Sequence, residues 1–157
     1  MKGATYIIRD EIIANIKNGV PLKDIFNNSG SADKRGFYKT VLSLINAGEI
    51  ANTMVCSCGF DCSRCRTFYA TVNDDDEARE MIRGLYAEMG HTVEKGELNC
   101  FGCRSDEMMP LCSGCPYLKC GRERGLERCG ECNEYPCESL KWYKETYLET
   151  GMNKFYV

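Results

Sequence analysis

The chain has 157 residues, a formal net charge of −3, twelve cysteines and one histidine. No apolar run reaches the roughly 18 residues of a membrane helix, and Arg9 and Asp10 interrupt the apolar N-terminal stretch, so we expect a cytoplasmic chain without membrane span or signal peptide. Reduced cytosolic thiols favour metal binding over disulfides, and residues 56–157, with thirteen Lys and Arg against eighteen Asp and Glu, are too acidic to favour nucleic-acid binding.

Three helices are predicted in the N-terminal third. Isoleucines repeat at helical spacing over residues 5–18, and Pro21 suits the first turn of a short second helix. A turn over residues 27–30 follows, and Ser31 or Asp33 then caps a third helix that Gly48 ends. The apolar side chains expected to face inward are Ile8, Ile12, Ile13, Ile16, Leu22, Ile25, Phe26, Phe37, Val41, Leu44 and Ile45.

This order of elements is typical of a helix-turn-helix domain with a wing. Residues 50–55 are a candidate short strand, and residues 37–50 resemble the third helix and wing entry of winged-helix domains. The outward face of the third helix would then contact DNA, weakly in a monomer and better in a homodimer. The candidate DNA-binding residues are Lys34, Arg35, Tyr38 and Lys39. The alternative is a plain three-helix cap with a solvated basic face.

Two further helices are predicted around cysteine-rich loops. Asp74 and Glu77 suggest a capping-box start for a helix over residues 74–89, residues 100–137 are expected to be loop, and a last helix covers about 138–150. The stripe of the first helix is Ala78, Met81, Ile82, Leu85, Tyr86 and Met89. The last helix carries Leu140, Trp142, Tyr143, Tyr147 and Leu148. We expect its aromatic side chains to pack against the first helix rather than to stack on bases.

Eight cysteines form four C-x2-C pairs. In chain order these pairs, one to four, are Cys62/Cys65, Cys100/Cys103, Cys112/Cys115 and Cys129/Cys132. A C-x2-C turn aims two sulfurs at one point, and two such turns complete a tetrahedral four-thiolate site, so we expect two or three zinc ions. Iron–sulfur clusters use the same ligands, and an iron–sulfur redox protein or accessory subunit stays open as the alternative.

The spacing suggests how the pairs combine. Pair three, followed by Cys120, recurs seventeen residues later as pair four, followed by Cys137, which predicts two similar metal knuckles. Pairs three and four have the spacing closest to that of a zinc ribbon and are expected to share one site. Pairs one and two would then form the other site. Cys120 or Cys137 could replace a member of either set.

The sequence gives little support for catalysis. His91 is the only histidine, and its place at a predicted helix end favours a capping or surface role over that of a base or ligand. Cys58-x3-Cys62-x2-Cys65 has the spacing of radical adenosylmethionine enzymes, but that chemistry needs a barrel, and Arg64 stands where those enzymes commonly have an aromatic residue. Phosphate loops and two-histidine zincin motifs are absent. We therefore assign no catalytic residue.

The order of cysteine motifs from about Cys58 to Phe155 is specific. It runs Cys58-Gly-Phe-Asp-Cys62-Ser-Arg-Cys65, Cys100-Phe-Gly-Cys103, Cys112-x2-Cys115-Pro, Cys120 and Cys129-Gly-Glu-Cys132-Asn-Glu-Tyr-Pro-Cys137-Glu. This order resembles domain-of-unknown-function family 3795, which is regarded as zinc-binding and has no established activity. The resemblance implies eleven family cysteines as metal ligands: Cys58, Cys62, Cys65, Cys100, Cys103, Cys112, Cys115, Cys120, Cys129, Cys132 and Cys137. Cys56 is extra to that pattern, and the N-terminal segment lies outside it.

Taken together, the sequence predicts a mainly α protein with small irregular or β parts. Residues 1–55 would form a helical, winged-helix-like domain, and residues 56–157 a metal-stabilised, cysteine-rich α domain. The leading hypothesis is a non-enzymatic zinc-binding regulator or adaptor with a weak DNA-binding arm and an unidentified protein partner. The alternatives are the iron–sulfur protein and a structural zinc module that serves only protein–protein contact.

Overall fold

The computed structural model describes residues 9–148 and 152–156 of the chain. It is mainly helical, which confirms the predicted fold class. The first residues of the predicted helix 5–18, Ile8 among them, and residues 149–151 at the end of the last helix lie outside the described residues. Within the described part, no helix is both long and apolar enough to cross a bilayer.

The three N-terminal helices form as predicted. They are α1 (Arg9–Lys17), α2 (Leu22–Asn28) and α3 (Lys34–Asn46). Pro21 precedes α2 as its N-cap residue. Of the two candidate caps for α3, Asp33 has this role, because its carboxylate accepts a 2.8 Å hydrogen bond from the backbone N–H of Gly36.

The strand expected over residues 50–55 is wrong. The chain instead doubles back on itself, because the backbone N–H of Cys56 donates to Phe60 O at 2.8 Å and that of Cys62 donates to Met54 O at 3.0 Å. Only an isolated bridge joins Val55 to Asp61, so no sheet partner is present among the described residues of this segment. The predicted wing therefore has no strand, and this segment serves instead to bring cysteines together.

A helix that the periodicity did not predict, α4 (Arg66–Asn73), follows the first cysteine motif and packs on α3 and α5. Asp74 ends α4 in the left-handed conformation, with φ of 55°. The next helix, α5 (Asp76–Glu88), is capped by Asp75, whose carboxylate accepts from Ala78 N at 2.9 Å. The predicted capping role of Asp74 is thus wrong, because Asp74 ends the preceding helix.

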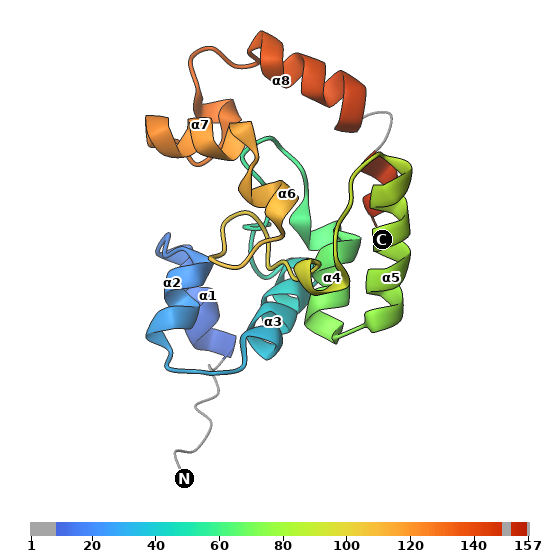
Figure 1. Cartoon of the computed structure of the whole chain (residues 1–157). Coiled ribbons are helices and arrows are strands. Elements are labelled where there is room, and N and C mark those ends of the chain that lie inside the picture. Colours follow the sequence, from blue (N-terminus) through green and yellow to red (C-terminus); the bar gives the residue numbers. More distant parts are fainter. Residues whose placement is uncertain (1–8, 149–151, 157) are drawn as a thin grey trace.

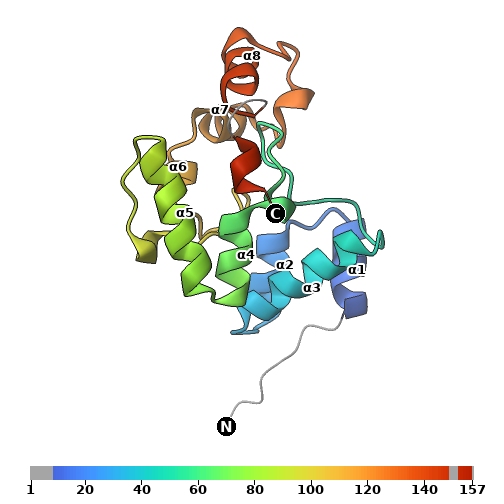
Figure 2. The ribbon, with the colours of Figure 1, turned by 90° about the vertical axis from the view of Figure 1, so that its right-hand side faces the viewer.

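Short elements occupy residues 100–137, the region that was predicted to be loop. They are α6 (Pro110–Ser113), α7 (Pro116–Arg124) and η3 (Cys129–Glu131). Two 3₁₀ turns precede this region, namely η1 (Cys62–Arg64) and η2 (Lys95–Glu97). The chain ends in α8 (Glu138–Tyr143), the π-helical segment η4 (Lys144–Leu148) and the 3₁₀ segment η5 (Met152–Phe155). Figures 1 and 2 both place α7 and α8 at the end of the molecule opposite α1, α2 and α3.

The C-terminal aromatics do not pack as expected. Trp142 is 58% exposed, and Met81, assigned to the apolar stripe of α5, is 54% exposed. The ring of Tyr86 on α5 instead packs against Phe155, with ring centroids 4.6 Å apart. The final 3₁₀ segment therefore covers the face of α5 that α8 was expected to cover.

Side chains from both predicted domains share one core. Tyr38 on α3 is 1% exposed, and its ring centroid lies 4.9 Å from that of Phe101 and 6.2 Å from that of Phe68. The outward placement of Tyr38 is therefore wrong, because this face of α3 packs on α4 and on the loop that carries Cys100 and Cys103. The division of the chain into two domains between residues 55 and 56 stays a prediction.

Candidate metal centre

The twelve cysteines line two separate cavities. The larger cavity, of about 370 Å³, is lined by eight cysteines: Cys56, Cys58, Cys62, Cys65, Cys100, Cys103, Cys112 and Cys115. The smaller cavity, of about 60 Å³, is lined by the other four: Cys120, Cys129, Cys132 and Cys137. Within residues 9–148 and 152–156, no three His, Cys, Asp or Glu side chains already surround a common metal position.

The first wall of the larger cavity is the loop that doubles back before α4. It brings Cys56 Sγ to 3.0 Å from Cys62 Sγ. The Asp61 carboxylate caps η1 by accepting from Ser63 N at 3.0 Å, which holds the turn between Cys62 and Cys65. Cys65 is the N-cap residue of α4, and burial raises the pKa of its thiol, although the backbone N–H groups of the first turn oppose this shift.

The second wall is positioned by α4. Thr71 Oγ1 donates to Thr67 O at 2.7 Å and accepts from the backbone N–H of Cys100 at 2.9 Å. Gly102, with φ of 95°, makes the turn between Cys100 and Cys103, and a side chain there would approach Cys62 Cβ to 3.5 Å. The helix that periodicity missed therefore aligns the first and second C-x2-C pairs.

Contacts between thiols control their protonation. Hydrogen bonding from Cys56 lowers the pKa of Cys58 to about 7, although burial opposes it. Hydrogen bonding from Cys112 likewise lowers the pKa of Cys100 to about 7. The pKa of Cys56 is raised by its hydrogen bonds with Cys103 and Cys58 and by burial, and that of Cys112 by its hydrogen bond with Cys100 and by burial. Some thiols of this cavity thus ionise readily, and the thiolate is the form that binds metals.

The smaller cavity collects cysteines from three short elements. Cys120 lies on α7, Cys129 and Cys132 flank η3, and Cys137 is the N-cap residue of α8. Nη1 of Arg124 lies 3.3 Å from Cys132 Sγ, and the same guanidinium also pairs with Glu134. Such a cation offsets the negative charge that four thiolates would carry.

The cysteines are grouped differently from the arrangement that their spacing favoured, in which pairs three and four form one zinc-ribbon-like site. Pairs one and two do line the same cavity, as expected, but pair three joins them there, while pair four lies in the other cavity with Cys120 and Cys137. Cys56, which the family pattern left out, contacts Cys62 within the larger cavity. The C-x-C spacing of Cys56 and Cys58 is the sequence signal that could have assigned it.

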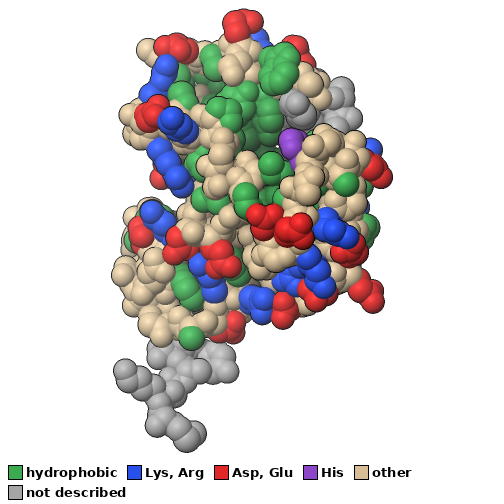
Figure 3. All heavy atoms as spheres, in the orientation of Figure 1, with side chains coloured by type: hydrophobic (Ala, Val, Ile, Leu, Met, Phe, Trp, Pro, Cys, Tyr) green, Lys and Arg blue, Asp and Glu red, His purple; other side chains and the backbone are tan. Residues whose placement is uncertain are grey.

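The single histidine lies at the edge of the larger cavity. His91 is exposed, and it lines this cavity together with Met89, Leu111 and Trp142. Figure 3 shows the opening as a hollow bordered by hydrophobic side chains, with the histidine beside it. The surface role predicted for His91 agrees with this exposure.

The candidate DNA-binding residues are largely engaged within the protein. Lys34 Nζ pairs with Asp106 at 2.7 Å and with Glu107 at 3.2 Å. Partial burial opposes the charged form, but these two carboxylates raise the pKa of Lys34 above its ordinary value. Arg35 Nη2 pairs with Asp74 at 2.8 Å, and Lys39 is exposed. DNA binding by this face stays a prediction, without the contribution expected from Tyr38.

Fold and site define a mainly helical, cysteine-rich protein with its thiols in two cavities. A family model described as "Protein of unknown function (DUF3795)" matches residues 54–142, more than half of the chain and the whole range that contains the cysteines. The chain belongs to this family, as the resemblance of its cysteine motifs implied. Neither the curated proteins nor the solved structures include a match to this chain.

Proposed function

We propose that this protein is a non-enzymatic zinc-binding protein that acts as a regulator or adaptor. The observation that carries the proposal is the convergence of Cys120, Cys129, Cys132 and Cys137, from three elements, on one small cavity. Four thiolates are a typical ligand set for a structural zinc ion, and the cavity volume of about 60 Å³ suits a single ion rather than a larger cofactor.

The energetics of this part of the molecule support a metal. Between residues 110 and 146, the buried side chains are few, and Tyr117, Leu118 and Leu140 supply most of the apolar burial. So small an apolar core cannot by itself offset the conformational entropy of ordering α7, η3 and α8. Structural zinc contributes on the order of 10 kcal/mol to folding in small domains, which would hold these elements together.

The adaptor role rests on the exposed surface near the same site. Tyr135, between Cys132 and Cys137, is 44% exposed, and Trp142 on α8 is 58% exposed. Exposed aromatic side chains are enriched at protein–protein interfaces, because they bury large apolar areas on binding. Zinc would then fix the positions of the two elements that present them.

The test is metal analysis of protein purified without air, for the native chain and a Cys120→Ser/Cys137→Ser variant. We expect the variant to lose about one zinc per chain, the content of one four-thiolate site. Ser113→Ala, which removes an exposed hydroxyl from α6, is the control and should keep the native zinc content. Equal zinc in the native chain and the double variant would contradict the proposal.

A further inference from the structure

The larger cavity is too large for mononuclear zinc alone. A zinc ion draws four sulfurs to about 2.3 Å from itself and leaves no space between them. The cavity of about 370 Å³ instead falls within the roughly 300–1,000 Å³ range of cofactor and small-molecule pockets. Eight thiols around such a volume are enough ligands for a polynuclear cofactor.

The thiols in this cavity are placed in two neighbouring groups. Cys56 Sγ lies 3.0 Å from Cys62 Sγ, and Cys58 and Cys103 lie near it. Cys112 contacts Cys100, and Cys65 lies near both Cys62 and Cys100. Cys115 lies toward Cys58 and Cys103 and completes the set of eight. Each group draws on loops that are distant in sequence, so ligands would come from both sides of the cavity.

Backbone N–H groups point at these sulfurs. The N–H of Phe60 donates to the Cys58 sulfur, those of Thr67 and Phe68 to Cys65, those of Gly102 and Met109 to Cys100, that of Ser57 to Cys103, and those of Tyr117 and Leu118 to Cys115. Hydrogen bonds to the sulfurs are a main means by which proteins stabilise iron–sulfur clusters and set their potentials. Five of the eight thiols therefore already lie in the environment of a cluster ligand.

The walls between the thiols are apolar, with one polar exception. Phe60, Phe68 and Met109 are buried side chains that line the cavity. Thr67 lines it too and is 0% exposed, and its hydroxyl lies toward the Cys65 sulfur. This hydroxyl is therefore placed to donate a hydrogen bond to a Cys65 thiolate that holds a cluster.

We propose that the larger cavity binds at least one iron–sulfur cluster through its cysteines. This site is distinct from the proposed zinc site, and eight thiolates suffice for two four-cysteine clusters. The exposed lining residues His91, Leu111 and Trp142 mark the opening of the cavity, which would provide the entry path for iron and sulfide. The protein would thus hold two kinds of metal centre, one for each cavity.

The test uses the whole chain, purified without air and then supplied with ferrous iron and sulfide. We expect broad visible absorption, iron and acid-labile sulfide in about equal amounts, and an electron paramagnetic resonance signal on reduction or oxidation. Two matched variants separate the cavities. Cys56→Ser/Cys103→Ser should lose at least half of the iron and sulfide and keep the zinc, whereas Cys120→Ser/Cys137→Ser should lose zinc and keep the colour.

The native chain decides the question even if the first variant fails to fold. Fewer than about two irons per chain after reconstitution, the minimum for a cluster, would overturn the proposal. A colourless protein with two or three zinc ions would overturn it and leave the zinc proposal standing. A coloured native chain that holds iron and sulfide but no zinc would support the cluster proposal and contradict the zinc proposal.

Discussion

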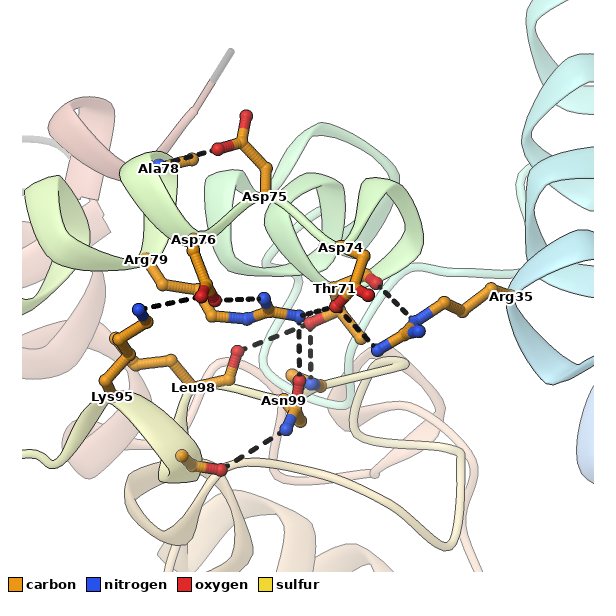
Figure 4. Close-up of polar contacts among 12 residues, drawn as sticks. Arg35, Thr71, Asp74, Asp75, Asp76, Ala78, Arg79, Lys95, Leu98 and Asn99 are labelled. Carbon is orange, nitrogen blue, oxygen red and sulfur yellow. Dashed lines mark hydrogen bonds and ion pairs between the residues drawn. The ribbon is translucent and has the colours of Figure 1, made fainter.

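At the scale of single residues, the run Asp74–Asp76 shows how neighbouring acids take different roles. Asp74 ends α4, Asp75 caps α5, and Asp76 pairs with Arg79 at 2.8 Å (Figure 4). Arg79 is only 5% exposed, and its guanidinium also bonds to Asp74 and to Asn99, each at 3.1 Å. The sequence explains why acids lie at the start of a helix. It does not predict that Asp74 and Asp76 share the buried Arg79, because Arg79 is buried only when α5 packs on the loop before Cys100.

The acid dependence of stability should report on this network. Lys95 and then Arg79 hold the pKa of Asp76 below its ordinary value. The contribution of the ionised Asp76 carboxylate to the free energy of unfolding is therefore complete above about pH 4, the ordinary carboxyl range. It is lost as the pH falls through the lowered pKa of Asp76. We expect Asp76→Asn to lower the urea midpoint at neutral pH and to approach the native midpoint near pH 3, below the ordinary range.

The matched control is Asp10→Asn, an exposed acid on α1. Its urea midpoint should differ little from that of the native chain at any pH. A constant difference between Asp76→Asn and the native chain across the whole range would show that the loss is not electrostatic. The measurement is urea unfolding followed by far-ultraviolet circular dichroism.

At the scale of elements, sequence pattern found the helices with strong apolar periodicity. α1, α2, α3 and α5 were predicted to within a few residues, because each has a repeating apolar face and a recognisable start. α4, α6 and α7 were missed. α4 and α7 begin directly after a cysteine of a C-x2-C pair, and α6 contains one, so their starts lie within the cysteine motifs. α6 has a single turn and α7 a weak apolar face, so contacts from elsewhere in the fold stabilise them.

The start of α5 offers a direct test at this scale. Asp75→Ala removes the carboxylate that accepts from Ala78 N, so the free energy of unfolding should fall by about 1 kcal/mol, as for other N-cap replacements. Asp75→Ser keeps an acceptor at the same place and should stay close to the native value. If Asp75→Ala proved neutral in equilibrium urea unfolding, the cap would not contribute to stability.

At the scale of the whole molecule, the cysteine spacing predicted the local pairs better than the way in which those pairs combine. C-x2-C turns are local, so the four pairs could be read from the chain, whereas the assignment of pair three depends on how α6 and α7 turn back onto the Cys56–Cys65 loop. One backbone contact illustrates this, since Cys129 N donates to Ser57 O at 2.9 Å and thereby joins the two cavities. Such long-range contacts have no signature in the spacing.

The same scale decides whether the N-terminal helices fold independently of the cysteine-rich part. Tyr38 packs on Phe68 and Phe101, and Lys34 pairs with Asp106 and Glu107. Truncating a large buried aromatic side chain costs roughly 3–5 kcal/mol, a large share of the 5–15 kcal/mol stability of a typical domain. We therefore expect Tyr38→Ala to destabilise both parts together.

The measurement follows two signals during thermal unfolding of the metal-loaded protein: helix content by circular dichroism, and metal release by a chromogenic chelator. In Tyr38→Ala both transitions should move to lower temperature by the same amount, because one shared core links them. Tyr38→Phe keeps the ring and should stay near the native midpoint, which separates packing from the hydroxyl. If helix content decreased first while metal release kept its native midpoint, residues 1–55 would be a separate domain and Tyr38 only a surface contact between the two. Coincident shifts would instead mean that α3 forms part of the scaffold that holds Cys100 and Cys103 in place, so the N-terminal helices would stabilise the larger cavity directly.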